Sequence, residues 1–476
     1  MEAHEIGKFK VNVRLENLTL AGFRGFRDEV SLDFDSLQTL LIGQNGVGKS
    51  TILDALAGTL DYVAALLRGG AYNPQDFFNY FDVNNQIGDQ GSANIFLRLR
   101  VDFPYINGYQ DDNAIWEWAR DYSFGINLEL TRHKELNVFH QVRLIESDSV
   151  RNLFEDALKD HLREWLRLSN DPSFDLVTSL ELPVMSYYTT RRMDQGIQET
   201  TRRIDSSIFS NYTNKELSPN SYHFPTLKKW LSLQFLIKTQ KGDNGNSSKR
   251  KMYDTIIHAV LQFLNAGETN QFSNILFEWD EDFPEGEMTI LKKDSKLYYS
   301  QLSSGEKVVL ALVADITRQL VIANPKHENP LQGAGIVLVD EIDLHLHPRW
   351  QRRIVENLRE VFPNIQLIAT THSPLLIGTL SSRQIWLLEE GNAYQPDATY
   401  GHDIASIVEG VMDTPVSDFE EAYGNVYRLL ALNDLAEAKA NMNKLKAIFL
   451  EKDDEFPPEF LKLEAIFSRK KTTSSK

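Results

Sequence analysis

Nine residues near the amino terminus have the types and the spacing of a loop that binds phosphate groups. They are Gly43-Gln44-Asn45-Gly46-Val47-Gly48-Lys49-Ser50-Thr51, and they contain the pattern G-x-x-x-x-G-K-S. An apolar, β-prone run precedes them at residues 39–42, and residues 52–57 have helical spacing. A strand, a glycine-rich loop and a helix start point several backbone N–H groups at one anion. The segment therefore predicts a phosphate-binding loop.

Two side chains of this loop can act on a bound nucleotide. Lys49 is expected to reach the β- and γ-phosphates, and the Ser50 hydroxyl is expected to be a ligand of Mg²⁺. The other positions expected to contact the nucleotide are Gly43, Asn45, Gly46, Val47, Gly48 and Thr51. An accidental match in an ordinary loop would give the same letters, but the flanking strand and helix patterns argue against it.

Two acids at the end of a buried strand form a second candidate. The aliphatic run 336–339 predicts a central strand, and Asp340 and Glu341 follow it. Ligands of open α/β sheets bind at the carboxyl ends of the strands. Asp340 is thus expected to hold Mg²⁺, directly or through water, and Glu341 to be the base that orients an attacking water. Solvated acids at a strand end are the alternative.

A third candidate is the start of a helix, and a fourth is a histidine after a strand. Ser303, Ser304, Gly305 and Glu306 precede the apolar run 308–314, so their backbone N–H groups and the Ser303 hydroxyl can meet a phosphate. A plain capping box, Ser303 with Glu306, explains the same pattern, and both interpretations can hold together. His372 follows the run 365–370 and is expected to hydrogen-bond the γ-phosphate.

Asp343, His345 and His347 also stand close to Glu341. Their alternation just after a strand favours a loop at a subunit contact over a metal site.

The order and spacing of these segments resemble those of the ATPase head of ATP-binding-cassette proteins. Ser304 and Glu306, where transporters prefer Gly and Gln, resemble the branch of structural-maintenance-of-chromosomes and RecF proteins, as does the turn Phe23-Arg24-Gly25-Phe26. The resemblance covers residues 10–105 and 288–400. It implies ATP and Mg²⁺ as cofactors, Arg24 near the nucleotide, and two heads that sandwich two ATP molecules. Each ATP would meet Lys49 of one protomer and Ser303–Gly305 of the other.

One departure from that family is visible. Its members carry a Mg²⁺-contacting glutamine after a strand that aligns with residues 185–188, whereas Thr189-Thr190-Arg191-Arg192 follow here. Either Gln195 reaches the metal or that ligand is missing.

A narrower set of residues resembles the Septu (PtuA) and retron-associated anti-phage defence ATPases. It comprises the run 182–188 leading to Arg191-Arg192, the run 400–404, and a tail with helical patterns at 425–449 and 458–467. One apolar stripe of the tail consists of Leu429, Leu432, Leu435, Ala438, Met442, Leu445 and Phe449. The resemblance implies a separate HNH-type nuclease as partner. Packing of the stripe on its own head is the alternative.

The expected fold is α/β: an ABC-type ATPase head with a mixed, largely parallel central sheet, flanking helices and an antiparallel β-subdomain. We expect an N-terminal lobe at 1–105, an insertion of edge hairpins and a mostly helical arm at 106–287, a C-terminal lobe at 288–400 and a helical interaction region at 401–476. The residues indicate strands at 13–15, 18–20, 30–34, 95–101 and 182–188, a hairpin at 124–130 and 135–144, another at 288–291 and 296–299, helices at 151–168 and 251–264, an exposed loop at 71–91 and a linker at 241–251.

Composition narrows the class of protein. The 476 residues have 42% hydrophobic and 25% charged content and no cysteine, which excludes disulfides and Cys-ligated metals. No apolar run is long enough for a membrane span, and the first residues lack a signal peptide, so a cytoplasmic protein is expected. The net charge is −17. Residues 186–251 nevertheless carry 12 Lys and Arg against 5 Asp and Glu, either a solvated face or a nucleic-acid contact.

Four functions fit a chain of this kind. The first is an ATP-driven regulator of a separate nuclease in anti-phage defence. The second is a RecF-like DNA repair or recombination ATPase, whose long coiled-coil relatives are disfavoured because no heptad repeat is sustained. A transporter subunit is disfavoured by the variant at 303–306 and the large insertion. A self-contained nuclease of the overcoming-lysogenisation-defect family is disfavoured because the 104 residues after His372 have a helical pattern.

Overall fold

The computed structural model describes most of the predicted head and a few residues of the tail. The described residues are 9–68, 82–84, 92–110, 113–132, 138–145, 180–190, 224–240, 247–266, 271–279, 281, 286–293, 295–324, 327–396, 399–400, 426, 437–443 and 446. The chain forms two compact units. The first comprises residues 1–376 and 382–396, and the second comprises residues 377–381 and 397–476. All the predicted site residues belong to the first unit.

A six-stranded sheet is the centre of the first unit. Its strand order is β16-β15-β4-β14-β13-β9, and only the β15–β16 pair is antiparallel. The strands are β4 (Gln38–Ile42), β9 (Val184–Tyr188), β13 (Gly335–Val339), β14 (Ile365–Thr370), β15 (Ile385–Glu389) and β16 (Asn392–Tyr394). Val339 lies opposite both Ala369 and Tyr188. The carboxyl ends of β4, β14, β13 and β9 therefore meet at one edge.

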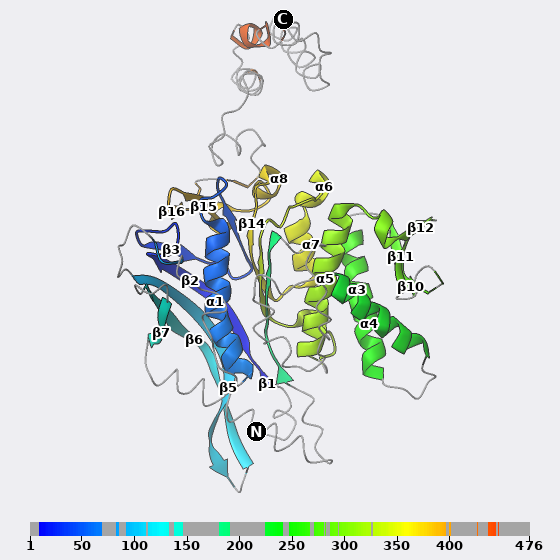
Figure 1. The fold of residues 1–476 in the computed structure, drawn as a ribbon, viewed down its shortest axis with the longest axis horizontal. Helices are drawn as coiled ribbons and strands as arrows, with labels where there is room; N and C mark the ends of the chain where they lie inside the picture. The colour runs from blue at the N-terminus through cyan, green and yellow to red at the C-terminus, as the bar shows by residue number, and fades with distance from the viewer. Residues whose placement is uncertain are drawn as a thin grey trace, which may run out of the picture. The chain divides into compact units, whose positions relative to one another are not determined.

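Helices cover both faces of this sheet, which explains why its strands are unbroken aliphatic runs. Every residue of β4, β9, β13 and β14 is buried. Helix α1 (Lys49–Arg68) packs on one face, and α5 (Ser304–Ala323) and α7 (Ile354–Val361) lie on the other (Figure 1). The predicted strands at 335–339 and 365–370 are confirmed.

A five-stranded antiparallel sheet lies beyond α1 in Figure 1, with the order β3-β2-β5-β6-β7. Its strands are β2 (Asn12–Ala21), β3 (Val30–Asp33), β5 (Ser92–Gln110), β6 (Asn113–Arg132) and β7 (Val138–Ile145). The segments predicted as strands at 13–15 and 18–20 belong to one continuous strand, β2, which has a register shift between Leu15 and Asn17. The predicted edge hairpin is present as β6 and β7. Strand β5 runs through residue 105, where a lobe boundary was expected.

A single buried glutamine joins the two sheets at that irregularity. The backbone N–H of Leu15 donates to Gln366 Oε1 at 2.8 Å, and Gln366 Nε2 donates to the Leu15 carbonyl at 2.9 Å. Because Gln366 belongs to β14, it satisfies the backbone that the irregularity in β2 leaves unpaired.

Helices and a small sheet follow on the far side of α5. They are α3 (Phe224–Gln240), α4 (Ser247–Asn265), β10 (Phe272–Glu278), β11 (Glu287–Lys292) and β12 (Ser295–Tyr298). The helix at 251–264 and the hairpin of β11 and β12 are as predicted. The linker expected at 241–251 is wrong for its last five residues, because α4 begins at Ser247 and includes Lys249, Arg250 and Lys251.

Short elements complete the described structure. They are β1 (Phe9–Lys10), β8 (Leu180–Glu181), η7 (Tyr299–Gln301), η8 (Pro330–Gln332), α6 (Pro348–Gln351), α8 (Pro374–Ile377) and η9 (Ser382–Gln384). In the second unit, residues 437–443 are helical, and Val426, Ala438 and Met442 are buried. Across the described helices, none is long and apolar enough to cross a membrane.

The predicted fold class is confirmed: the first unit is an α/β structure with a largely parallel central sheet, flanking helices and an antiparallel β-subdomain. Several predictions concern residues outside the described part. They are the helix at 151–168, Arg191, Arg192, Gln195, most of the loop at 71–91, most of the basic stretch 186–251 and most of the tail stripe. The division into four segments stays a prediction.

Candidate active site

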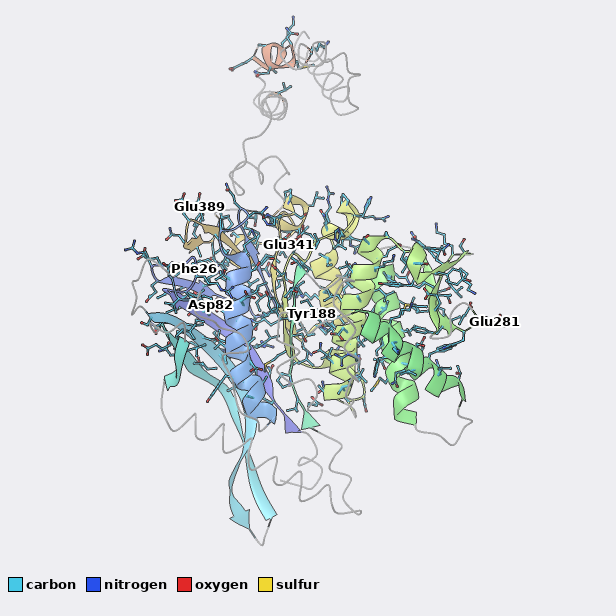
Figure 2. The ribbon with its side chains drawn as sticks, in the orientation of Figure 1. Phe26, Asp82, Tyr188, Glu281, Glu341 and Glu389 are labelled. Atoms are coloured by element: carbon cyan, nitrogen blue, oxygen red, sulfur yellow. The ribbon has the colours of Figure 1, made fainter. Side chains whose placement is uncertain are left out.

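The phosphate loop joins the end of β4 to the start of α1, as predicted. Gly43, Gly46 and Gly48 have φ angles of +140°, +84° and +108°, which L side chains rarely adopt. A Cβ at Gly48 would also lie 2.9 Å from the ring of Phe26. The ring of Phe26 is fully buried beside α1 (Figure 2) and supports the loop from below. The glycine pattern thus reflects both the backbone conformation and close packing.

Lys49 crosses the phosphate loop with its ammonium group. Its Nζ donates to the carbonyls of Gly43 at 2.8 Å and Gln44 at 2.7 Å. Burial lowers the pKa of Lys49, while the carboxylates of Asp340, Glu341 and Asp343 act in the opposite direction. A cation is therefore held over the loop, where an anionic ligand would be bound.

Ser50 and Asp340 meet at the carboxyl edge of the sheet. The Ser50 hydroxyl lies 3.1 Å and 3.0 Å from the two carboxylate oxygens of Asp340. The Asp340 backbone N–H donates to the carbonyl of Tyr188, and Thr370 Oγ1 donates to Asp340 Oδ1 at 2.7 Å. Mg²⁺ prefers oxygen ligands, and the Ser50 hydroxyl and the Asp340 carboxylate are two such groups placed side by side. The pair therefore has the chemistry that the predicted metal site requires.

Glu341 adopts an unusual backbone conformation at the end of β13. Its φ angle is +49°, a region that non-glycine residues seldom occupy. The Glu341 N–H donates to Thr370 Oγ1 at 2.7 Å, so one threonine holds both acids. Figure 2 shows Glu341 at the carboxyl end of the central sheet. Strained backbone of this kind is frequent where a side chain must be aimed at a ligand.

His372 follows β14 and lies within the electrostatic influence of Lys49, Asp340, Glu341 and Asp343. Burial lowers the pKa of His372, and the positive charge of Lys49 lowers it further. The carboxylates of Asp343, Glu341 and Asp340 oppose this shift without reversing it. The imidazole is therefore neutral near pH 7 and can both donate and accept a hydrogen bond. Thr371 fixes the neighbouring loop by donating to Asp343 Oδ1 at 2.5 Å.

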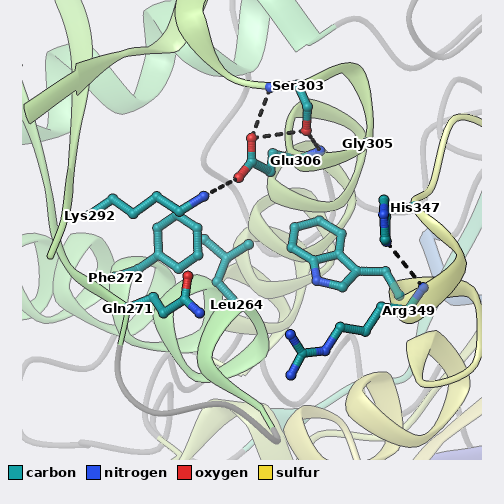
Figure 3. Close-up of a pocket in the computed structure, with 10 residues that line it drawn as sticks. Leu264, Gln271, Phe272, Lys292, Ser303, Gly305, Glu306, His347 and Arg349 are labelled. Carbon is teal, nitrogen blue, oxygen red and sulfur yellow. Dashed lines mark hydrogen bonds and ion pairs between the residues drawn. The ribbon is translucent and has the colours of Figure 1, made fainter. Parts of the chain in front are cut away.

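The segment Ser303–Glu306, called the signature segment below, begins α5 with the predicted capping box. The Glu306 N–H donates to Ser303 Oγ at 3.2 Å, and the Ser303 N–H donates to Glu306 Oε2 at 2.8 Å. Lys292 Nζ binds the other carboxylate oxygen at 2.9 Å. A pocket of about 270 Å³ opens beside this cluster (Figure 3).

The signature segment packs closely on the loop that follows Glu341. A Cβ at Gly305 would lie 2.7 Å from the carbonyl oxygen of His345. His345 has a φ angle of +64°, and His347 caps α6 by accepting from the Arg349 N–H. The loop that contains Asp343, His345 and His347 thus lies between Glu341 and the signature segment.

Arg24 is engaged by carboxylates of its own chain. Its φ angle is +47°. Its Nε donates to Asp82 Oδ1 at 2.6 Å, and its Nη1 donates to Asp54 Oδ2 at 2.5 Å. Tyr187 also donates to Asp54, at 2.9 Å. A contact between Arg24 and a nucleotide would have to replace at least one of these ion pairs.

A buried polar network links β9 to α5, and no motif of the sequence predicted it. Tyr188 donates to Asp315 Oδ2 at 2.8 Å, and Ser186 donates to Gln319 Oε1 at 2.5 Å. Arg318 binds the other oxygen of Asp315 at 2.8 Å. The strand that supports Asp340 and the helix that carries the signature segment are therefore held together by satisfied polar groups.

The structure brings Lys49, Ser50, Asp340, Glu341 and His372 together at one edge of the sheet. The signature segment makes its hydrogen bonds elsewhere, and Arg24 is tied to α1. Sequence reasoning missed Phe26, Thr370, Lys292 and the carboxylates that hold Arg24. Thr370 and Phe26 stood within segments that the sequence analysis singled out for other residues.

The fold and the arrangement of these residues define a P-loop ATPase. The chain belongs to the family described as "AAA domain, putative AbiEii toxin, Type IV TA system", whose model matches residues 39–378. A second model, "P-loop containing region of AAA domain", matches residues 15–62.

Three curated relatives are similar over most of this chain. The "Retron Vc95 probable ATPase" of Vibrio cholerae is 29% identical over 406 residues, which cover 79% of this chain and 74% of the relative. The "Retron Ec83 probable ATPase" of Escherichia coli is 28% identical and covers 86% and 78%. The "Septu protein PtuA" of Bacillus mycoides is 25% identical and covers 88% of this chain but 47% of its own length.

Proposed function

We propose that this ATPase closes as a dimer around ATP and thereby regulates a separate effector nuclease in anti-phage defence. The observation that carries the proposal is the separation of two binding surfaces on one chain. Lys49, Ser50 and Asp340 form one surface at the phosphate loop. Ser303 binds Glu306 instead, and Glu306 also binds Lys292. A second copy of the chain supplies the missing surface.

Within this proposal, each residue of the phosphate-loop surface has one role. Lys49 and the loop amides bind the triphosphate, and Ser50 with Asp340 hold Mg²⁺, which when bound neutralises phosphate charge. Glu341 orients and deprotonates the attacking water, and neutral His372 donates a hydrogen bond to the γ-phosphate. Ser303, Ser304 and Gly305 of the partner complete the site. The γ-phosphate then gives the closed dimer its extra affinity.

The relatives support the biological part of the proposal. Retron ATPases and a Septu protein are similar to this chain over three quarters of its length or more. We propose that this chain likewise serves a retron or Septu type of defence, with an HNH-type nuclease as the executing partner. A RecF-like repair ATPase would share the head, but the similarity to retron and Septu proteins favours defence.

The variant Glu341→Gln tests the proposal. It should bind ATP, lose at least about 100-fold in kcat because the general base is absent, and accumulate as a dimer. The dimer is measured by light scattering coupled to size-exclusion chromatography, with and without ATP. Glu356→Gln, which removes a surface carboxylate of α7 paired with Arg353, is the matched control and should behave like the parent.

Two results would contradict the proposal. Hydrolysis by Glu341→Gln at the parent rate would show that another group is the base. A protein saturated with ATP that stays monomeric, alone and with its cognate nuclease, would remove the dimer.

A further inference from the structure

The anion-binding donors of the signature segment already hold an anion, which is the carboxylate of Glu306. Glu306 Oε2 accepts from the Ser303 N–H at 2.8 Å and from the Ser303 hydroxyl at 2.9 Å (Figure 3). A hydroxyl has one proton to donate. The Ser303 hydroxyl therefore cannot donate to a phosphate while it donates to Glu306.

The carboxylate of Glu306 opposes phosphate binding at Ser303 by its charge as well as by its position. Burial raises the pKa of Glu306, but hydrogen bonds from Lys292 and Ser303 lower it more, so the group is ionised at neutral pH. A phosphate arriving at Ser303 would meet a negative charge at hydrogen-bonding distance from the same donors. Like charges placed together in a binding interface oppose binding.

A cation and an aromatic ring hold this carboxylate in place. Lys292 Nζ lies 2.9 Å from Glu306 Oε1 and 4.8 Å from the centre of the Phe272 ring. Both side chains line the pocket beside Ser303, together with Gln271 and Arg349 (Figure 3). The pocket gives the carboxylate space to move away from Ser303 while it keeps its contact with Lys292.

We propose that Glu306 is an internal phosphate mimic that keeps the signature segment closed, and that Lys292 withdraws it when the triphosphate bound by a second copy arrives. This inference rests on the proposed ATP-bridged dimer. It adds that the affinity of the dimer for ATP is reduced by a residue of the binding surface itself. Glu306 and Lys292 are positioning residues, since both act through Ser303.

The alternative is that Glu306 is only a capping residue of α5. The two roles make opposite predictions for Glu306→Gln. A capping role alone means that the variant destabilises α5 and weakens assembly. A phosphate mimic means that the variant destabilises the free protein and yet strengthens assembly, because a neutral amide competes less for Ser303 and can itself donate to phosphate.

The experiment measures dimer formation against ATP concentration in the Glu341→Gln background, where hydrolysis is stalled. Adding Glu306→Gln should lower the ATP concentration at half-assembly by about tenfold, while the thermal unfolding temperature without ATP falls. Adding Lys292→Met should raise the concentration needed, because the carboxylate then loses its neutralising partner. Adding Ser303→Ala should weaken assembly and abolish the gain from Glu306→Gln, as a double-mutant cycle would reveal.

Glu278→Gln is the matched control, since Glu278 pairs with Lys296 in the same small sheet and should leave assembly unchanged. Unchanged or weaker assembly with Glu306→Gln would overturn the phosphate mimic and leave the ATP-bridged dimer standing. Absence of any dimer in the Glu341→Gln background would overturn both. Should Glu306→Gln fail to fold, Lys292→Met decides alone, and unaltered assembly there overturns the inference.

Discussion

The phosphate-loop surface and the signature segment are built in different ways. At the phosphate loop, Asp340 and Glu341 follow a fully buried strand, and the hydroxyl of Thr370, itself fully buried, fixes both. The signature segment instead begins a helix at the surface, and its polar groups bind one another. The first surface is arranged before any ligand arrives, whereas the second is closed by its own side chain.

This difference indicates which of the two surfaces can control assembly of the dimer in our proposal. In our proposal, the nucleotide binds at a surface whose two acids are already fixed in place, as in other preorganised sites. A surface that must first release its own carboxylate sets a threshold for assembly. The contact between Gly305 and His345 places the second surface against the loop that follows Glu341. Assembly and catalysis can therefore influence each other through a short path.

The largest expected effect removes the cation of the phosphate loop. Lys49→Ala deletes the ammonium group that, in our proposal, leaves the carbonyls of Gly43 and Gln44, 2.8 Å and 2.7 Å away, to bind the phosphates. Charged hydrogen bonds contribute about 1.5–3 kcal/mol each, so ATP affinity should fall at least about 100-fold. Titration calorimetry checks this. Binding at parent affinity would separate the loop from nucleotide recognition.

The next effect concerns the threonine that holds both acids. Thr370→Val keeps the shape but leaves the Glu341 N–H without its acceptor, at a cost of about 1–3 kcal/mol. We expect kcat to fall about tenfold, because the Glu341 side chain is no longer held in one direction. The affinity for ATP should change little, because the contacts of Lys49 are unaffected.

Steady-state kinetics and calorimetry separate these effects of Thr370→Val. Thr370→Ser should restore most of the activity. Thr317→Val, which removes a buried hydroxyl bonded within α5, should leave kcat unchanged. An equal loss in both valine variants would mean that Thr370 acts only through stability.

The sequence predicted well where Asp340, Glu341 and His372 lie, because these residues follow strands that are recognisable on their own. The runs at 336–339 and 365–370 could be buried strands of a parallel sheet, and parallel strands bring their carboxyl ends together. Asp340, Glu341 and His372 were thereby placed at one edge without any side-chain geometry.

The signature segment was only half predictable. The capping box of Ser303 and Glu306 is local in sequence, so spacing alone revealed it. Lys292 comes from a different strand, and its approach to Glu306 depends on how β11 packs against α5. The same limit applies to Phe26 below Gly48, to Gln366 between the sheets and to the carboxylates around Arg24. Long-range side-chain pairing is not encoded in any window of residues.

A smaller effect tests the contact between the two surfaces. A Cβ at Gly305 would lie 2.7 Å from the His345 carbonyl oxygen and 3.3 Å from the Leu346 Cα. Gly305→Ala must therefore shift backbone, at a cost of about 1–3 kcal/mol. ATP-driven assembly should weaken about tenfold, with ATP binding to the monomer unchanged. Gly25→Ala is the control, because a Cβ there meets nothing within 4 Å. Unaltered assembly would remove the coupling.

The smallest effect concerns the charge of His372. Burial and the charge of Lys49 lower the pKa of His372 below the ordinary value of 6.5. The unfolded chain therefore binds a proton at His372 more readily than the folded chain does. Stability is complete above about pH 6.5 and decreases as the pH falls from there towards the lowered pKa of the folded protein. His372→Gln removes this term, so its unfolding temperature should decline less between pH 7 and pH 5.5 than that of the parent. The control for the loss of one histidine is His258→Gln, because His258 is an exposed residue of α4.

The variant Lys49→Ala tests the second cause of the shift. The pKa of His372, followed by NMR, should rise in this variant, because one of the two causes that lower it is gone. A pKa that stays constant in that variant would show that the cation over the loop and the histidine after β14 do not share one electrostatic environment.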